Sequence, residues 1–258
     1  MSYGTLYGVG VGPGASDLLT RRAVKVLRRA DVIILPRSSH YGVSTAWKII
    51  RPVVRKATHQ EHLFLTFPMT REPAKHTSAW EKAFTQIGAR LERGLSVAFA
   101  SEGDPSLYST FIYLQREAVQ RWPGVQVEVV PGVSSITAVP SVTGVTLADG
   151  LERIAIIPAG YGVDDLVDIL NRFDTTILMK IGSEMPKVIA ALEATGLTDK
   201  AVYVSHATMR EQRIVRDMRQ LEAERGDCFA MIVVSRKERC GVLAGDVPPD
   251  ALLRSVTE

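Results

Sequence analysis

Short apolar runs alternate with segments of helical periodicity along almost the whole chain. Most of these runs are continuously apolar and do not alternate apolar with polar positions. Continuous runs are typical of strands that helices cover on both faces of a sheet. The pattern predicts an α/β fold with strands at residues 6–11, 32–35, 62–67, 96–100, 125–130, 154–157, 176–181, 201–205 and 229–234.

Apolar residues at helical spacing predict the helices and their ends. Over residues 80–91 they fall at i, i+3, i+4, i+7 and i+11, and Gly94 follows as a stop signal. A second apolar stripe covers residues 18–27, with Ser16 placed before it as an N-cap. Further helices are expected at residues 111–119 and, with Ser183 as the cap, at 183–192.

The tripeptide Trp122-Pro123-Gly124 is the clearest break in the middle of the chain. A chain of 258 residues is long enough for two domains of ordinary size. We therefore expect one α/β domain over residues 1–122 and a second over 123–258. No fixed-period repeat and no low-complexity segment is visible in the sequence.

Composition narrows the function classes further. Apolar residues make up 46% of the chain and charged residues 23%, with a net charge of only +3, which favours a globular protein without a nucleic-acid partner. The two cysteines, Cys228 and Cys240, have neither the spacing of a zinc site nor a disulfide framework, and no metal site is expected. The start of the chain has no signal-peptide pattern, and no apolar run reaches the ~20 residues that span a bilayer. We expect a cytoplasmic protein.

The first candidate site is the glycine series of residues 8–14, which ends a strand and opens a helix. Glycines let a ligand approach the backbone, and the free N–H groups at a helix start favour an anion. A dinucleotide fold needs an acidic residue after the second strand, where this chain has Pro36-Arg37. A P-loop needs Gly-Lys-Ser/Thr, which is absent here. The alternative is a tight turn that binds no ligand.

The second candidate is the turn at residues 101–108, which follows a predicted strand and precedes a predicted helix. Open α/β sheets bind ligands at such turns, outside the carboxyl ends of the strands. Asp104-Pro105 also matches an N-cap followed by the first helical residue, a purely structural role that contributes about 1 kcal/mol. The alternative is that the turn, with Glu102 or Asp104, contacts a bound molecule.

Two further segments lie at predicted strand ends. Residues 131–136 place small hydroxyl side chains before a helix, where they can bind a ligand carboxylate or cap the helix. Residues 36–41 combine basic and hydroxyl groups, and Arg37 can form a forked contact with a carboxylate. The alternative for both is a structural loop.

Other chemically active residues point to no site of their own. His206 ends a predicted strand and is expected to be structural, while Met179 and Lys180 are expected to pack or to extend towards water. No Ser-His-Asp or Cys-His set can be assembled from the sequence, and no catalytic side chain is assigned.

Taken in order, these motifs resemble those of the tetrapyrrole (corrin/porphyrin) methylases. The matching segments are residues 6–14 with Asp17-Leu18-Leu19-Thr20, the turn Gly103-Asp104-Pro105, residues 131–135 and residues 176–182. Within the family the chain is most similar to the C20-methyltransferases of vitamin B12 synthesis. The similarity to that subgroup rests on Ser101-Glu102-Gly103-Asp104, Pro36-Arg37-Ser38, Phe67-Pro68-Met69 and residues 178–181.

The resemblance implies two α/β domains of the tetrapyrrole methylase type, an active-site cleft between them, and a homodimer. It also implies that S-adenosylmethionine lies folded in that cleft. The contacts carried over by motif are Pro13, Glu102, Gly103, Asp104, Leu107, Ser134, Ser135, Ile181 and Ala207. Ala207 stands where the family often has glycine, which would narrow the site without closing it.

The implied substrate is precorrin-2 or its cobalt-bearing counterpart, cobalt-factor II, methylated at C20 to precorrin-3A or cobalt-factor III. A reduced tetrapyrrole is itself the nucleophile, so the protein need supply only position and a dry pocket. Arg37, Ser38 and Tyr108 are the expected substrate contacts. The sequence does not decide whether the substrate carries cobalt, although residues 67–69 and 109–111 favour the cobalt-dependent branch. Methylation at another ring position and a non-catalytic nucleotide-binding module remain as alternatives.

Overall fold

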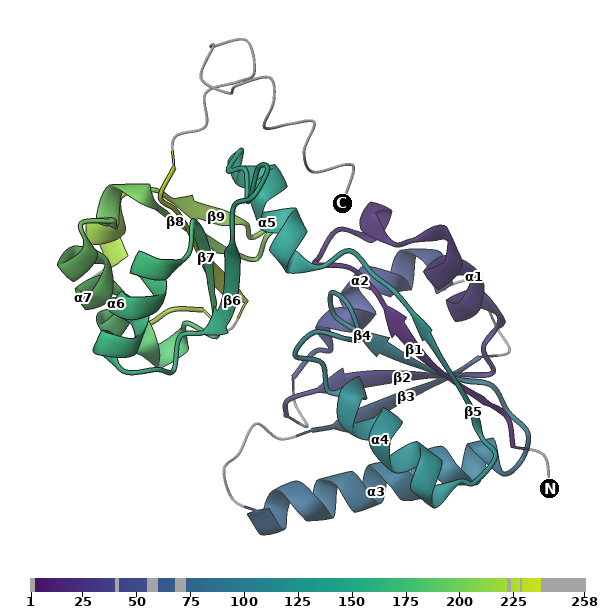
Figure 1. The fold of residues 1–258 in the computed structure, drawn as a ribbon. Helices are drawn as coiled ribbons and strands as arrows, with labels where there is room; N and C mark the ends of the chain where they lie inside the picture. The colour runs from purple at the N-terminus through teal and green to yellow at the C-terminus, as the bar shows by residue number, and fades with distance from the viewer. Residues whose placement is uncertain are drawn as a thin grey trace. The chain divides into compact units, whose positions relative to one another are not determined.

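The computed structural model describes residues 3–39, 42–54, 60–67, 73–221, 224–227 and 229–237. The chain forms two compact units, Met1–Ser135 and Ile136–Glu258. Each unit is an α/β arrangement built around its own five-stranded sheet, as the apolar runs predict (Figure 1). None of the helices in the described ranges has the length and apolar character needed to cross a bilayer.

The first unit contains a parallel sheet with the strand order β3-β2-β4-β1-β5. The strands are β1 (Thr5–Gly10), β2 (Val32–Arg37), β3 (Glu61–Thr66), β4 (Val97–Ser101) and β5 (Gln126–Val130). The helices are α1 (Arg21–Arg29), α2 (Thr45–Val54), α3 (Pro73–Leu91) and α4 (Phe111–Arg121). Because all five strands are parallel, their carboxyl ends lie along one edge of the sheet.

Helices cover both faces of this sheet. On one face Phe99 of β4 packs in a core with residues of α3 and α4. On the other face Ala98 and Ala100 pack in a separate core with residues of α1 and α2 (Figure 1). Burial on both faces explains why the inner strands β2 and β4 are almost continuously apolar in the sequence.

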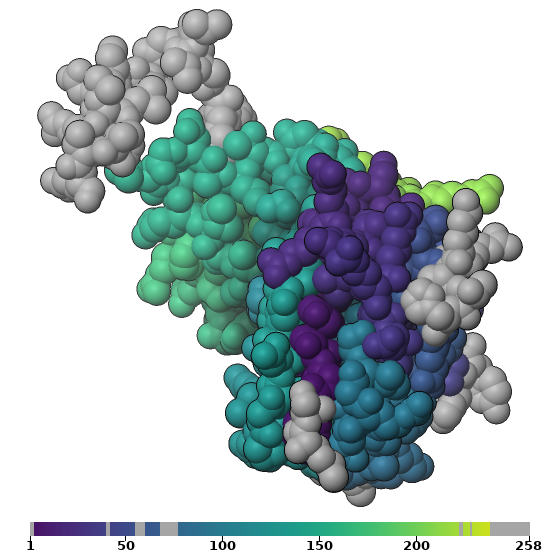
Figure 2. All heavy atoms as spheres, turned by 90° about the vertical axis from the view of Figure 1, so that its right-hand side faces the viewer, coloured from purple at the N-terminus to yellow at the C-terminus, as the bar shows by residue number. Residues whose placement is uncertain are grey.

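The compact units divide after Ser135, later in the chain than the break at Trp122-Pro123-Gly124. The reason is β5, which pairs with β1 along its whole length and so belongs to the first sheet. Figure 2 shows the dark purple start of the chain flanked by teal residues from much later in the sequence, as this pairing requires. The expected boundary at residue 122 placed β5 in the second domain, because the pairing of β5 with β1 is not visible in the sequence.

The second unit contains a mixed sheet with the strand order β6-β7-β10-β8-β9. Only β6 and β7 are parallel to each other, and the other neighbours are antiparallel. The strands are β6 (Ile154–Pro158), β7 (Thr175–Met179), β8 (Ala201–Ser205), β9 (Arg213–Val215) and β10 (Ala230–Ser235). Helix α5 (Ser135–Thr143) begins at the division, and α6 (Val163–Arg172) and α7 (Met185–Thr195) pack on the sheet.

All nine predicted strands are present, and no end differs from the prediction by more than two residues. The sequence did not predict β9, because its Arg213 and Ile214 are exposed and it forms no apolar run. Gly94 adopts a left-handed φ of 76° just after α3, which confirms it as a stop signal.

The helix caps predicted at Ser16 and Ser183 are wrong. Thr20, and not Ser16, caps α1, because its hydroxyl accepts a hydrogen bond from the Ala23 N–H at 3.1 Å. Ser16 lies in a separate 3-10 turn, Ser16–Leu18. Ser183 also lies in a 3-10 turn, Gly182–Glu184, and α7 has no side-chain cap.

Candidate functional site

The glycine series of residues 8–14 and the turn after β4 lie beside each other at the switch point of the sheet. At a switch point, the connections from two neighbouring strands lead to opposite sides of the sheet. Strands β1 and β4 are neighbours, but the chain leaves β1 towards β2 and leaves β4 towards β5. The helices that follow them, α1 and α4, pack in the cores on opposite faces. Ligands of open α/β sheets bind at such switch points. The first two candidate segments therefore form one site.

Hydrogen bonds join the two segments directly. The Gly103 N–H donates to the Gly12 carbonyl at 2.8 Å, and the Gly12 N–H donates to the Gly103 carbonyl at 3.3 Å. Both glycines have left-handed φ angles, 82° and 65°, which side chains disfavour. The two turns are therefore held together by their main chains.

The third candidate segment reaches the same place. A Cβ on Gly132 would lie 2.2 Å from the Gly103 carbonyl oxygen, and a Cβ on Gly10 would lie 2.5 Å from the Gly132 nitrogen. The backbones that follow β1, β4 and β5 therefore approach one another too closely for any side chain. A Cβ on Gly103, by contrast, would meet no atom within 4 Å, so open space lies beside this turn.

Asp104 stabilises the turn through hydrogen bonds other than the helix N-cap that the sequence predicts. The expected N-cap role is wrong, because α4 begins only at Phe111, whose N–H donates to the Ser109 hydroxyl at 3.0 Å. Asp104 Oδ1 instead accepts from the Ser106 N–H, and Oδ2 accepts from the Gly132 N–H, both at 2.9 Å. Partial burial opposes ionisation of Asp104, but the hydrogen bonds from Ser106 and Gly132 hold its pKa below the ordinary value.

Glu102 connects this turn to a different helix. Its Oε1 accepts a hydrogen bond at 3.2 Å from the N–H of Ala46, the second residue of α2. Glu102 is exposed as a residue, yet its carboxyl group is packed among protein atoms. This burial raises the pKa of Glu102, against the lowering effect of the Ala46 hydrogen bond.

The other expected cofactor contacts of the first unit belong to the same three segments. Pro13 follows the Gly12 turn and is half-buried. The Leu107 N–H donates to the Asp104 carbonyl at 3.3 Å. Ser134 and Ser135 come after β5 and the short segment 131–133, and Ser135 is the first residue of α5. The order of strands β4, β1 and β5 thus gathers residues from three distant parts of the sequence.

The expected substrate contacts also lie at this edge of the sheet. Arg37 ends β2, donates from Nε to the Thr66 hydroxyl at 3.3 Å, and holds its guanidinium 5.8 Å from the centre of the Phe64 ring. Ser38 is exposed beside it. Tyr108 is also exposed and has a left-handed φ of 50°, a strained conformation that is common at functional sites. His40, Tyr41, Pro68 and Met69 lie outside the described residues.

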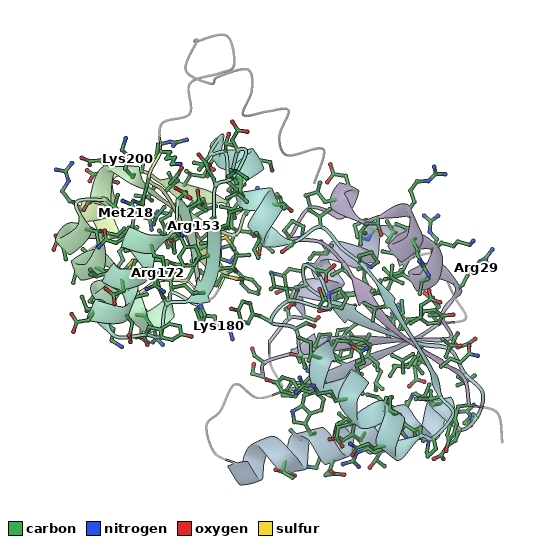
Figure 3. The ribbon with its side chains drawn as sticks, in the orientation of Figure 1. Arg29, Arg153, Arg172, Lys180, Lys200 and Met218 are labelled. Carbon is green, nitrogen blue, oxygen red and sulfur yellow. The ribbon has the colours of Figure 1, made fainter. Side chains whose placement is uncertain are left out.

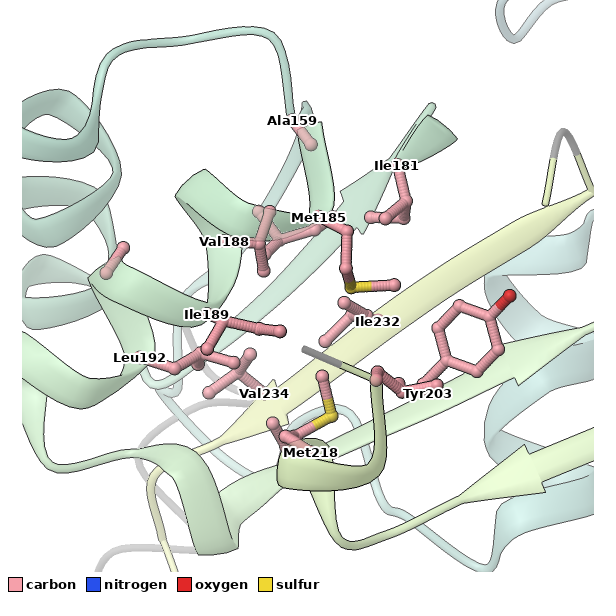
Figure 4. Close-up of a cluster of buried hydrophobic side chains, with 14 of the residues drawn as sticks. Ala159, Ile181, Met185, Val188, Ile189, Leu192, Tyr203, Met218, Ile232 and Val234 are labelled. Atoms are coloured by element: carbon pink, nitrogen blue, oxygen red, sulfur yellow. The ribbon is translucent and has the colours of Figure 1, made fainter. Parts of the chain in front are cut away.

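The remaining two expected cofactor contacts lie in the second unit, each shortly after a strand that pairs antiparallel with β10. Ile181 follows β7, and Ala207 follows β8. The Ile181 side chain is fully buried and points into the core beside Met185 (Figure 4), and Ala207 is buried as well. Neither residue therefore presents an exposed side chain to a ligand.

The backbone around Ile181 and Ala207 is strained. Lys180, His206 and Thr208 have φ angles of 56°, 50° and 66°, although none of them is glycine. Such angles cost energy and occur preferentially at functional sites. Lys180 is exposed at the lower side of this unit in Figure 3, in agreement with its predicted solvent-directed role.

The structure adds a polar pocket of about 520 Å³ that the sequence did not indicate. Its lining includes His206, whose Nδ1 lies 3.7 Å from Asp227 Oδ2, and the ion pair of Arg213 with Glu224. These residues are brought together by the pairing of β9 with β8, and β9 was not predicted. Among the described residues, no three His, Cys, Asp or Glu side chains gather as metal ligands.

Curated relatives are similar over most of the chain. "Cobalt-precorrin-2 C(20)-methyltransferase" of Salmonella typhimurium is 30% identical over 236 residues, covering 91% of this chain and 97% of that protein. "Precorrin-2 C(20)-methyltransferase" of a Sinorhizobium species is 33% identical over 218 residues, covering 80% and 85%. "Cobalamin biosynthesis protein CobIJ" of Mycobacterium tuberculosis is 33% identical over 220 residues, which are 82% of this chain. The match spans only 42% of the length of that protein.

Solved structures share the fold at lower identity. The X-ray structure of cobalt precorrin-4 methyltransferase CbiF matches with a TM-score of 0.66 and 22% identity, covering 90% of this chain and 94% of that one. Uroporphyrin-III C-methyltransferase from Thermus thermophilus, solved with S-adenosylhomocysteine, matches with a TM-score of 0.63 and 22% identity, covering 90% and 97%.

The family model of the "Tetrapyrrole (Corrin/Porphyrin) Methylases" matches residues 5–221. This range includes both sheets apart from β10, and all of the motifs gathered at the strand ends. The chain therefore belongs to the tetrapyrrole (corrin/porphyrin) methylase family.

Proposed function

We propose that this protein transfers a methyl group from S-adenosylmethionine to C20 of precorrin-2 or cobalt-factor II, in the biosynthesis of cobalamin. The product is precorrin-3A or cobalt-factor III. The observation that carries the proposal is the 30% identity to the Salmonella enzyme over nearly the full length of both chains. The match covers only 42% of the mycobacterial relative. The activity is therefore a proposal for this chain, to be tested by the assay described below.

The residues at the strand ends fit S-adenosylmethionine. Open space beside Gly103, next to main chains that approach without side chains, suits a cofactor that lies against the backbone. We place its contacts at Pro13, Glu102, Gly103, Asp104, Leu107, Ser134 and Ser135, and at the main chains of Ile181 and Ala207. When bound, this cofactor supplies an electrophilic methyl group on a sulfonium.

The protein contributes position more than covalent chemistry. Asp104 and the Gly12–Gly103 hydrogen bonds hold the turn in one shape, which orients what binds there. Arg37 lies two strands from β1 at the same edge, where a guanidinium can bind the carboxylates on the rim of a tetrapyrrole. Ser38 and the exposed ring of Tyr108 are the other proposed substrate contacts.

Three points remain predictions from the sequence: a cleft between the two domains, a homodimer and a cytoplasmic location. The cobalt content of the substrate is open as well, because relatives named for the cobalt-bearing and for the metal-free substrate are similarly identical to this chain.

The test is an assay of both substrates with S-adenosylmethionine that carries a ¹³C-methyl group. We expect one new methyl carbon at C20 by NMR, a matching mass increase and a changed absorption spectrum. A methyl group at another ring carbon would support the alternative of a methylase with different positional specificity. No transfer to either substrate would contradict the proposal as a whole.

A further inference from the structure

Glu102 lies between the residues proposed to hold the cofactor and those proposed to hold the substrate. It directly precedes Gly103, and it follows β4, the strand between β1 and β2. Its carboxyl reaches the first turn of α2, the helix that follows the Arg37–Ser38 segment. The Glu102 side chain therefore connects the turn proposed to hold the cofactor to the start of α2, the helix that follows the proposed substrate contacts Arg37 and Ser38.

The two oxygens of this carboxyl differ in their partners. Oε1 accepts from the Ala46 N–H, whereas the second oxygen has no hydrogen bond or ion pair to any of the described residues. Glu102 is nevertheless an exposed residue at the carboxyl edge of the sheet. The hydrogen bond to Ala46 therefore orients the group and leaves one oxygen for another molecule.

The surroundings also increase the basicity of the group. Burial of the carboxyl raises the pKa of Glu102, and the Ala46 N–H opposes this rise. The charged residues on the adjoining elements are Asp17 before α1, Arg37 on β2, Lys48 and Arg51 on α2, and Asp104 on the same turn. None of them is a cause of the shift, so the raised pKa reflects the local packing.

Methyl transfer to a ring carbon leaves a proton that must be removed. We propose that the second carboxylate oxygen of Glu102 accepts this proton, an inference that rests on the proposed function. The S–CH₃ bond breaks as the C20–CH₃ bond forms. The C20–H bond then breaks, its electron pair returns to the macrocycle, and the proton moves to the Glu102 oxygen.

The neighbouring carboxylate suits this role less well. Both oxygens of Asp104 already accept N–H groups, from Ser106 and Gly132, and these bonds lower its basicity. Glu102 combines a free oxygen with a raised pKa, the two properties expected of a general base.

The decisive experiment measures hydrogen exchange at C20 without methyl transfer. The substrate is incubated in D₂O with the protein and S-adenosylhomocysteine, and loss of the C20 proton signal is followed by NMR. Exchange requires the acid form of Glu102 to deliver a deuteron to C20 and its carboxylate to remove the proton. We expect Glu102→Gln to slow both exchange and methyl transfer by about 100-fold or more.

Further measurements on variants of Glu102 distinguish a general base from a residue that only stabilises the fold. The cofactor contact proposed for Glu102 is made by its main chain, and an amide oxygen still accepts the Ala46 N–H. Glu102→Gln should therefore bind S-adenosylhomocysteine within about threefold of wild type by calorimetry. The wild-type rate of methyl transfer should rise with pH as Glu102 ionises, and this rise should be absent in Glu102→Gln. Glu102→Asp, which keeps a carboxylate on a shorter arm, should restore part of the exchange. Glu92→Gln, at an exposed position after α3, is the matched control.

Unchanged exchange in Glu102→Gln would overturn the proposal, as would a parallel loss of folding and cofactor affinity in both Glu102 variants. A wild-type rate that does not rise with pH in the acid range would also overturn it. Failure of the proposed function has a different signature, because the wild type itself would then place no methyl group at C20.

Discussion

Asp104 Oδ2 accepts a hydrogen bond from the main-chain N–H of Gly132 at 2.9 Å, across 28 positions of the sequence. The bond joins the turn after β4 to the turn after β5, on either side of the glycine series that follows β1. Together with the Gly12–Gly103 bonds it links all three strand ends. The carboxylate of Asp104 therefore determines the shape of the site even without touching a ligand.

Asp104→Ala should weaken both the fold and the site. The variant loses the acceptor for Ser106 and Gly132, at a cost of about 1–2 kcal/mol once solvent screening of this partly exposed group is considered. Affinity for S-adenosylhomocysteine should fall as well, because Gly103 is no longer held. Denaturant unfolding and calorimetry measure the two effects, and an unchanged affinity would contradict the positioning role.

The contribution of Asp104 should depend on pH with a definite sign. Its pKa is lowered in the folded protein, so the stabilisation is complete above the ordinary value of 3.8 and is lost as the pH falls through the folded-state pKa. The difference in unfolding free energy between wild type and Asp104→Asn should therefore shrink below about pH 4. A constant difference from pH 7 to pH 3 would show that the charge is not involved.

Gly132→Ala should be among the most damaging single-methyl additions in the chain. The new Cβ would lie 2.2 Å from the Gly103 carbonyl oxygen and 2.8 Å from the Gly10 carbonyl carbon, and both are main-chain atoms that cannot move aside cheaply. We expect the loss of several kcal/mol of stability or displacement of the Gly103 turn with loss of cofactor binding. Gly160→Ala, where a Cβ meets no atom within 4 Å, is the control for thermal unfolding and should be nearly neutral.

Arg37→Ala should separate binding of the substrate from binding of the cofactor. Arg37 lies at the end of β2, which β4 separates from the strand that carries the glycine series, so S-adenosylhomocysteine should bind normally by calorimetry. Affinity for the tetrapyrrole should fall about tenfold or more, the effect of losing one charge-assisted contact. Arg29→Ala is the control, since this arginine is exposed on α1 and points away from the sheet (Figure 3). Equal loss of both ligands in Arg37→Ala would refute its assignment.

Ile181→Ala tests whether Ile181 acts through its main chain. The side chain is fully buried beside Met185, so its truncation should cost about 2–5 kcal/mol of stability (Figure 4). Cofactor affinity at a temperature where the variant is folded should change by less than about threefold, because the main chain is the proposed contact. Ile189→Ala in the same core is the matched control. A large loss of affinity in Ile181→Ala alone would assign the contact to the side chain.

Much of the architecture could be predicted from local patterns. Apolar runs, most of them continuous, located nine strands, since strands buried on both faces, such as β4, need apolar residues at nearly every position. The edge strand β9 was missed because its exposed Arg213 and Ile214 carry no such signal. The caps at Ser16 and Ser183 were wrong because each residue lies in a short 3-10 turn that precedes the α-helix, and local spacing does not distinguish the two kinds of turn.

The sequence by itself determined the family, the α/β class and the segments that form the site, because glycines and turn residues at strand ends are local features. Only the tertiary structure decided what Asp104 and Glu102 do. Their partners, Gly132 and Ala46, are distant in the chain and are brought near by the order of parallel strands. Strand order depends on long-range pairing and packing, and therefore a capping motif in the sequence became a link between two turns in the fold.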